Sequence, residues 1–150
     1  MKNLTRTFTL IIFVVATSSL SIPAQESNED KKISNVIYSY EKALNSNNVD
    51  SVLQQFAKDG ILILQGSPTR IGTEAVKEFF ILIFKKIDFD IKFNIEEIVH
   101  MSSEWAFVRT TTRSNNSTDS SEGGHEIFIL NKLMEIGKLQ GMQVLQPNNQ

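Results

Sequence analysis

The feature that most constrains the fold is an alternation of apolar and polar residues between positions 87 and 96. Five apolar residues occupy the odd positions: Ile87, Phe89, Ile91, Phe93 and Ile95. A period of two places all of them on one face of a β-strand, so the segment predicts a strand with one buried face. The alternation breaks at Glu96-Glu97 and then resumes, which predicts a β-bulge that bends the strand.

Helical patterns precede this strand. Apolar residues recur at spacings of three and four over residues 33–44, which predicts an amphipathic helix. Residues 49–56 predict a short second helix, residues 61–64 a short buried strand, and the segment from Thr73 to Phe84 a third helix.

Strand patterns follow it. We expect strands over residues 105–112, 126–134 and 138–146, with a polar hairpin loop at 114–124. The order of elements predicts an α+β domain in which three N-terminal helices cover one face of a curved antiparallel sheet.

The first 24 residues have the pattern of a secretory signal peptide. Lys2 and Arg6 precede an apolar run, residues 8–16, and Ser21-Ile22-Pro23-Ala24 resembles a cleavage site. The run is too short for a transmembrane helix, so we expect an exported protein, periplasmic or secreted, without a stable membrane span after cleavage. The alternative is an uncleaved N-terminal anchor.

After the predicted signal, we expect a polar tether at residues 25–32, the domain at 33–146 and a tail at 147–150.

Composition excludes several classes of function. The formal net charge is −2, and the predicted signal carries only positive charges, so the remainder is more acidic and lacks the basic stripe of a nucleic-acid-binding protein. The chain contains no cysteine, which removes thiol catalysis and thiolate metal sites. The two histidines, His100 and His125, fall in different predicted strands, and no phosphate-binding glycine loop is present. We therefore expect no metal and no nucleotide cofactor.

Five short segments carry a resemblance to a known family: Tyr40–Asp50, Phe56–Gly60, Ile71–Phe80, Trp105–Thr110 and Glu126–Leu130. In this order they resemble the SnoaL-like and SgcJ/EcaC-type (DUF4440-like) domains of the nuclear transport factor 2-like superfamily. Tyr40–Asp50 is similar to their Y-x-x-A-x-N-x-x-D helix turn, and Phe56–Gly60 to their F-A-x-D-G step into the first strand. Ile71–Phe80 resembles the start of the third helix, and Trp105–Thr110 and Glu126–Leu130 resemble two central strands. The resemblance implies a cone-shaped fold whose sheet wraps around the helices and leaves an apolar pocket at its wide end. The last strand departs from the pattern, since Leu139 and Gln143 stand where relatives carry an aromatic residue and an arginine.

The resemblance also implies candidate catalytic residues. Tyr40 matches a phenol that stabilises an oxyanion in isomerase-like relatives, and Glu126 matches a carboxylic acid kept protonated by an apolar site. The alternatives are a packed core tyrosine and a solvated carboxylate at the strand end. Phe128 and Leu130 share the side of Glu126, which favours an inward orientation. The carboxylate base of those relatives is replaced by Leu64, so the sequence leaves catalysis open.

Further residues are expected to line the pocket. Arg109 shares a strand face with Trp105 and Phe107, and we expect it there, paired with Glu126 or holding an anionic group; the alternative is an arginine on the convex face. The other expected lining residues are Phe56, Phe80, Phe84, Phe128 and Met142.

Two hypotheses about function result. The first is a binding domain for an apolar or amphipathic small molecule, with isomerase-, cyclase- or dehydratase-like acid–base chemistry as an extension. The second is a non-catalytic interaction module with a filled pocket, which forms a homodimer through the outer face of the sheet.

Overall fold

The computed structural model describes residues 27–115, 123–133 and 138–145, without the side chains of residues 140 and 142–145. The first part of the described chain contains three helices and two strands, and four more strands follow. The elements are α1 (Asn28–Asn45), α2 (Val49–Gln55), β1 (Phe56–Leu64), β2 (Arg70–Ile71), α3 (Gly72–Ile83), β3 (Ile91–His100), β4 (Trp105–Ser114), β5 (Gly123–Asn131) and β6 (Lys138–Leu145). Among the described residues, no helix is both long and apolar enough to cross a membrane.

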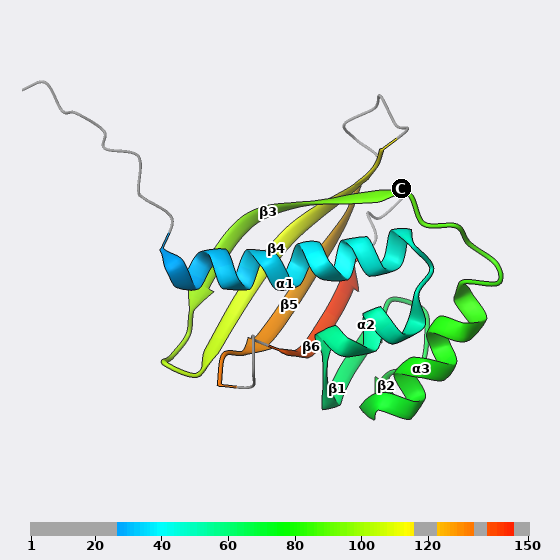
Figure 1. The fold of residues 1–150 in the computed structure, drawn as a ribbon, viewed down its shortest axis with the longest axis horizontal. Coiled ribbons are helices and arrows are strands. Elements are labelled where there is room, and N and C mark those ends of the chain that lie inside the picture. The colour runs from blue at the N-terminus through cyan, green and yellow to red at the C-terminus, as the bar shows by residue number, and fades with distance from the viewer. Residues whose placement is uncertain (1–26, 116–122, 134–137, 146–150) are drawn as a thin grey trace, which may run out of the picture.

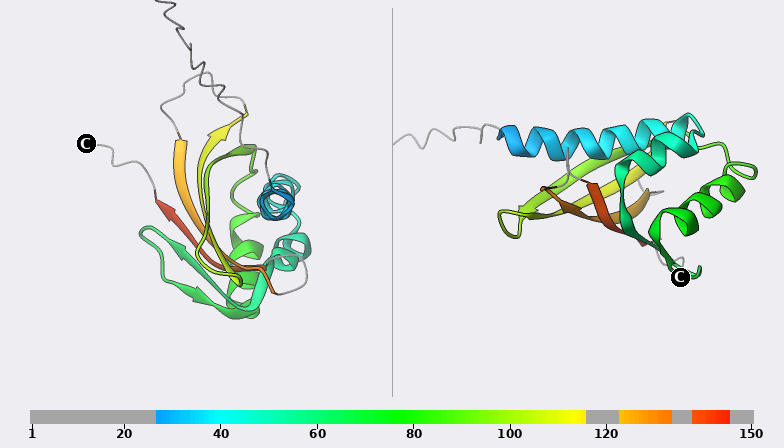
Figure 2. Two further views of the ribbon diagram at one scale, coloured as in Figure 1. Left: turned by 90° about the vertical axis from the view of Figure 1, so that its left-hand side faces the viewer. Right: turned by 60° about the horizontal axis from the view of Figure 1, so that its bottom comes forward.

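The strands form one six-stranded sheet in the order β2-β1-β6-β5-β4-β3. The sheet curves, and all three helices lie on its concave side, with α1 crossing the strands and α3 beside β1 (Figures 1 and 2). This arrangement confirms the predicted α+β class with helices on one face. The sheet is mixed rather than purely antiparallel, because β1 and β6 pair in parallel.

Several predicted boundaries are corrected. Helix α1 begins at Asn28, so residues 28–32, expected to be a tether, form its first turn. Strand β3 begins at Ile91, not Ile87, and Ile91 pairs with Ser114, the last residue of β4. The predicted bulge is confirmed by a register shift between Ile95 and Glu97.

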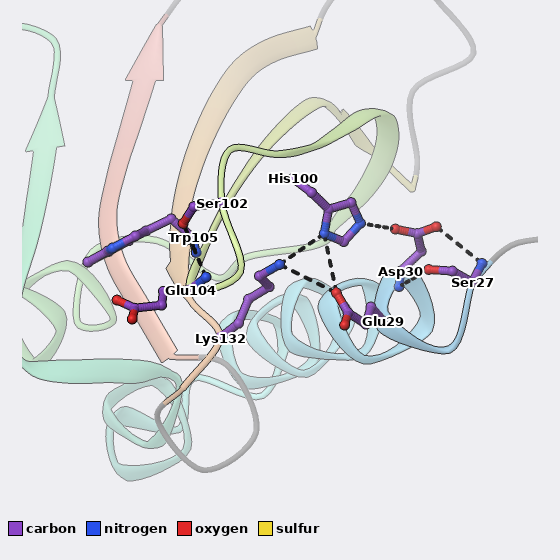
Figure 3. A network of polar contacts seen from close by, with 8 residues as sticks. All are labelled: Ser27, Glu29, Asp30, His100, Ser102, Glu104, Trp105 and Lys132. Atoms are coloured by element: carbon purple, nitrogen blue, oxygen red, sulfur yellow. Dashed lines mark hydrogen bonds and ion pairs between the residues drawn. The ribbon is translucent and has the colours of Figure 1, made fainter.

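A polar network holds the N-terminus of α1 against the sheet (Figure 3). Ser27 and Asp30 form a capping box, with each side chain accepting from the other residue's backbone N–H. His100 Nε2 lies 2.7 Å from Asp30 Oδ1, and Lys132 Nζ lies 3.4 Å from Glu29 Oε2. The hydrogen bonds from His100 and Ser27 lower the pKa of Asp30. Residues from β3, the end of β5 and α1 thus meet at one point.

The other end of α1 covers the free edge of β3. Asn45 donates from Nδ2 to the Ile91 carbonyl over 2.7 Å and accepts at Oδ1 from the Ile91 N–H over 2.9 Å. One turn earlier, Glu41 Oε2 accepts from the Phe93 N–H over 2.6 Å. Because β3 is an edge strand, these side chains satisfy backbone groups that would otherwise be open to pairing.

We expect Asn45→Ala to destabilise the protein, since it removes both hydrogen bonds to Ile91. The predicted loss is about 1–2 kcal/mol in the free energy of unfolding, measured by urea denaturation. Asn35→Ala, an exposed asparagine of the same helix, is the matched control and should change stability by less than about 0.5 kcal/mol. Equal effects in the two variants would contradict a specific role for Asn45.

Candidate functional site

Tyr40 is buried at the centre of an aromatic cluster between α1 and the sheet. Its ring stacks on Phe93 with a centroid distance of 6.0 Å and an interplanar angle of 10°. The rings of Phe56, Phe80 and Phe128 meet it edge-on, at centroid distances of 5.9, 6.4 and 6.0 Å. Contacts of this kind fix the plane of the phenol and therefore the direction of its hydroxyl.

Glu126 projects from β5 into the concave side and is only 4% exposed. The Thr110 hydroxyl, from the paired position of β4, donates to Glu126 Oε2 over 2.9 Å. Burial raises the pKa of Glu126, while the nearby hydroxyls of Thr112 and Thr110 and the charge of His125 lower it less strongly. The net shift favours the protonated acid, which can donate a hydrogen bond. Burial also raises the pKa of Tyr40, and the negative charge of Glu126 adds to that rise.

Thr112 supplies a third polar group on the same face of β4 as Thr110. Its cross-strand neighbours are Phe93 on β3 and Gly124 on β5. Its Oγ1 is close enough to influence the pKa of Glu126, yet it is buried and has no partner of hydrogen-bonding geometry among the described residues.

These groups border a cavity of about 260 Å³. It is slightly smaller than the pockets of about 300–1,000 Å³ that usually hold small molecules, which favours a compact ligand. Its described lining consists of apolar side chains apart from Tyr40, Thr112 and Glu126. The apolar lining residues are Leu44, Leu62, Leu64, Phe79, Phe80, Ile87, Phe89, Ile91 and Phe93.

Three of the residues expected in the pocket line this cavity: Tyr40, Glu126 and Phe80. Phe56 and Phe128 lie instead in the core, where they hold the Tyr40 ring. Phe84 packs between Phe80 and Phe89 without lining the cavity. The side chain of Met142 lies outside the described part of the chain.

The expected position of Arg109 is wrong. Its side chain is 45% exposed and pairs with Glu96 and Glu97 on the outer face of the sheet. Its partner across the sheet is Ile127, not Glu126. The inward face of β4 carries small residues, because the aromatic rings of α1, α3 and β5 already fill the space there. The outer face carries the larger Trp105 and Phe107.

Leu64 lines the cavity where isomerase-like relatives are expected to carry their base. Glu126 is the only carboxylate among the described lining residues. His100 is in the α1 network and His125 is exposed. No group of three or more potential metal-binding side chains occurs within the described ranges.

Thr112 was not identified from the sequence. The available signal was its parity with Thr110 together with Gly123-Gly124 on the partner strand, which leaves no side chain opposite its hydroxyl. Recognising that signal requires the register between β4 and β5, which depends on how these two strands pair.

Neither a family model nor a curated protein matches the sequence. Solved structures do match this chain. A ketosteroid isomerase-like protein of Erwinia carotovora has a TM-score of 0.68 at 24% identity, over 80% of this chain and 97% of that one. An NTF-2 like protein of unknown function from Shewanella oneidensis has a TM-score of 0.62 at 20% identity, over 77% and 98%. This chain has the nuclear transport factor 2-like fold.

A third match is a Nostoc punctiforme domain of unknown function with a cystatin-like fold, at a TM-score of 0.70 and 12% identity, over 82% of this chain and 80% of that one. These similarities confirm the expected nuclear transport factor 2-like fold. Because the fold hosts many activities, the function has to be argued from the cavity.

The raised pKa of Glu126 predicts how stability depends on pH. Between its unfolded and folded pKa values the folded state holds more protons, so stability falls as pH rises through that window. Glu126→Gln removes this dependence and should gain stability relative to the native protein as pH rises from 4.5 to neutrality, measured by thermal unfolding. Glu78→Gln, at an exposed position of α3, is the control. Parallel pH profiles for the native protein and Glu126→Gln would contradict the shift.

Proposed function

We propose that this protein is an exported SnoaL-like domain that binds a compact, uncharged, largely apolar small molecule with an oxygen acceptor. The observation that carries the proposal is the composition of the cavity lining, which is apolar apart from Tyr40, Thr112 and Glu126. Export rests on the signal-like N-terminus, which lies outside the described residues.

The cavity favours binding through donated hydrogen bonds. The Tyr40 hydroxyl donates, and Glu126 donates in the protonated form that its burial favours. Donors of this kind stabilise a carbonyl or hydroxyl oxygen more strongly in a dry site than in water. Isomerase-type proton abstraction needs a base near the ligand carbon, and Leu64 cannot act as one. We therefore propose binding, rather than isomerisation by the usual pair of carboxylates.

Tyr40→Phe tests the proposal with 2-acetylnaphthalene, a neutral ketone, and naphthalene as the matched probe without oxygen. We expect the variant to weaken ketone binding about five- to tenfold, the value of one hydrogen bond, and to leave naphthalene binding unchanged. Calorimetric titration measures both affinities.

The chain offers a close control for this test. Tyr38→Phe removes the other tyrosine hydroxyl, which is on the same helix but 47% exposed, and should change neither affinity. If the native protein binds neither probe, or if Tyr40→Phe weakens both equally, the proposed donor role of Tyr40 is wrong.

A second function is favoured by the outer face of the sheet. The registers align one outward row across all six strands, and its members are Val99, Phe107, Ile129, Gly141, Ile61 and Ile71. Ile71 is 66% exposed, and the flanking Ile63 is also exposed. We propose that this apolar row pairs with the same row of a second copy, because a two-fold contact lets one apolar patch cover itself.

Ile129→Lys tests this dimer, since it places a charge in the middle of the row. We expect the native protein to sediment as a dimer and Ile129→Lys as a folded monomer in analytical ultracentrifugation. Leu133→Lys, an exposed position outside the row, should remain dimeric. A monomeric native protein at micromolar concentration would exclude this interface.

A further inference from the structure

The alternating apolar row of residues 87–93 continues past the end of the sheet. Strand β3 begins at Ile91, yet Ile87 and Phe89, in the connection from α3, line the cavity together with Ile91 and Phe93. Exposure increases along this row: Phe93 is 3% exposed, Ile91 and Phe89 are half-buried, and Ile87 is 46% exposed. The row therefore runs from the core to the surface along one side of the cavity.

The two ends of the row distinguish the interior of the cavity from its mouth. At the inner end, Phe93 stacks on the ring of Tyr40, and both Tyr40 and Glu126 are buried. At the outer end, Ile87 is the one exposed side chain among the described lining residues, all others being buried or half-buried. The cavity thus meets solvent at Ile87, and Tyr40 lies deeper inside.

The backbone on either side of Ile87 holds this residue in position. Its N–H donates to the carbonyl of the last residue of α3 over 2.9 Å. Beyond it, Asp88 Oδ1 accepts from Asn47 Nδ2 over 2.8 Å, and Asp90 Oδ1 accepts from Asn115 Nδ2 over 2.6 Å. These bonds tie the connection to the turn after α1 and to the end of β4, so Ile87 forms a fixed rim of the mouth.

We infer that the ligand has an uncharged, oxygen-bearing head near Tyr40 and a short apolar tail that reaches Ile87, which makes Ile87 a specificity-determining residue for the tail. This inference rests on the proposed binding function and adds to it the orientation and the far end of the ligand. A tail that displaces water from the Ile87 side chain buries apolar surface, which improves affinity by up to about fourfold for each methylene.

The test compares acetophenone with 4-butylacetophenone, which differ only in the tail, by calorimetric titration of the full-length chain. The native protein should bind the butyl ketone more tightly. Ile87→Asp places a charge at the mouth and should weaken binding of the butyl ketone about fivefold, while acetophenone binding, which also reports that the variant is folded, stays unchanged. Ile87→Leu keeps an apolar side chain there and should retain most of the preference for the butyl ketone.

Leu82→Asp is the matched control. It introduces the same charge on α3 at a position that is 59% exposed and outside the cavity lining, so it should change neither affinity. An equal loss of butyl ketone binding in Leu82→Asp and Ile87→Asp would show a general effect of charge and would overturn the role of Ile87.

Tyr40→Phe separates this inference from the proposed function, because it should weaken both ketones by the same factor. If it does so while Ile87→Asp changes neither ketone, or both equally, the role of Ile87 is overturned and the proposed function stands. A native protein that binds 2-acetylnaphthalene without preferring the butyl ketone over acetophenone likewise overturns this inference alone. Failure of the native protein to bind any of the three ketones overturns both proposals.

Discussion

The packing of the Tyr40 ring between α1 and the sheet is the contact on which the rest of the structure depends. Rings from β1, α3, β3 and β5 all meet it: Phe56, Phe80, Phe93 and Phe128. The cluster therefore sets how far α1 stands from the sheet and where α3 lies against it. The same ring carries the hydroxyl of the candidate site, so the packing of the core also holds that hydroxyl in place.

Burial of Glu126 gives the cavity its chemical character. The chain places a carboxyl where water is excluded, and it supplies two threonine hydroxyls on the neighbouring strand but no lysine or arginine among the described lining residues. The acid is thus driven towards its neutral form, which is a donor rather than a counter-ion. The one arginine expected there, Arg109, is turned outward to Glu96 and Glu97, so it does not hold the acid ionised.

The two faces of the sheet suggest different tasks. The concave face combines aromatic rings with the polar groups of Tyr40, Thr112 and Glu126, and the convex face carries an apolar row interrupted at its centre by Gly141. The proposed binding of a ligand inside and the proposed pairing of two copies outside do not compete for the same residues. The edge of β3 is already occupied by Asn45 and Glu41 of α1, so self-association through that edge is disfavoured relative to the convex face.

The sequence by itself determined the class and order of elements, because hydrophobic periodicity is local and depends on side-chain direction alone. The three helices, the bulge at Glu96-Glu97 and the inward direction of Glu126 all follow from such patterns. Of the site residues proposed from the sequence, Tyr40, Phe80 and Glu126 border the cavity, whereas Phe56 and Phe128 lie in the core; their roles stay predictions.

Only the tertiary structure decided the rest. The alternation of residues along β4 assigns them to two faces of the strand, but it does not say which face lies on the concave side of the sheet. That depends on the volume already filled by α1 and α3. Arg109 was therefore assigned to the wrong face. The parallel pairing of β1 with β6 and the position of Thr112 opposite Gly124 likewise depend on strand register, which is set by contacts between segments far apart in the chain.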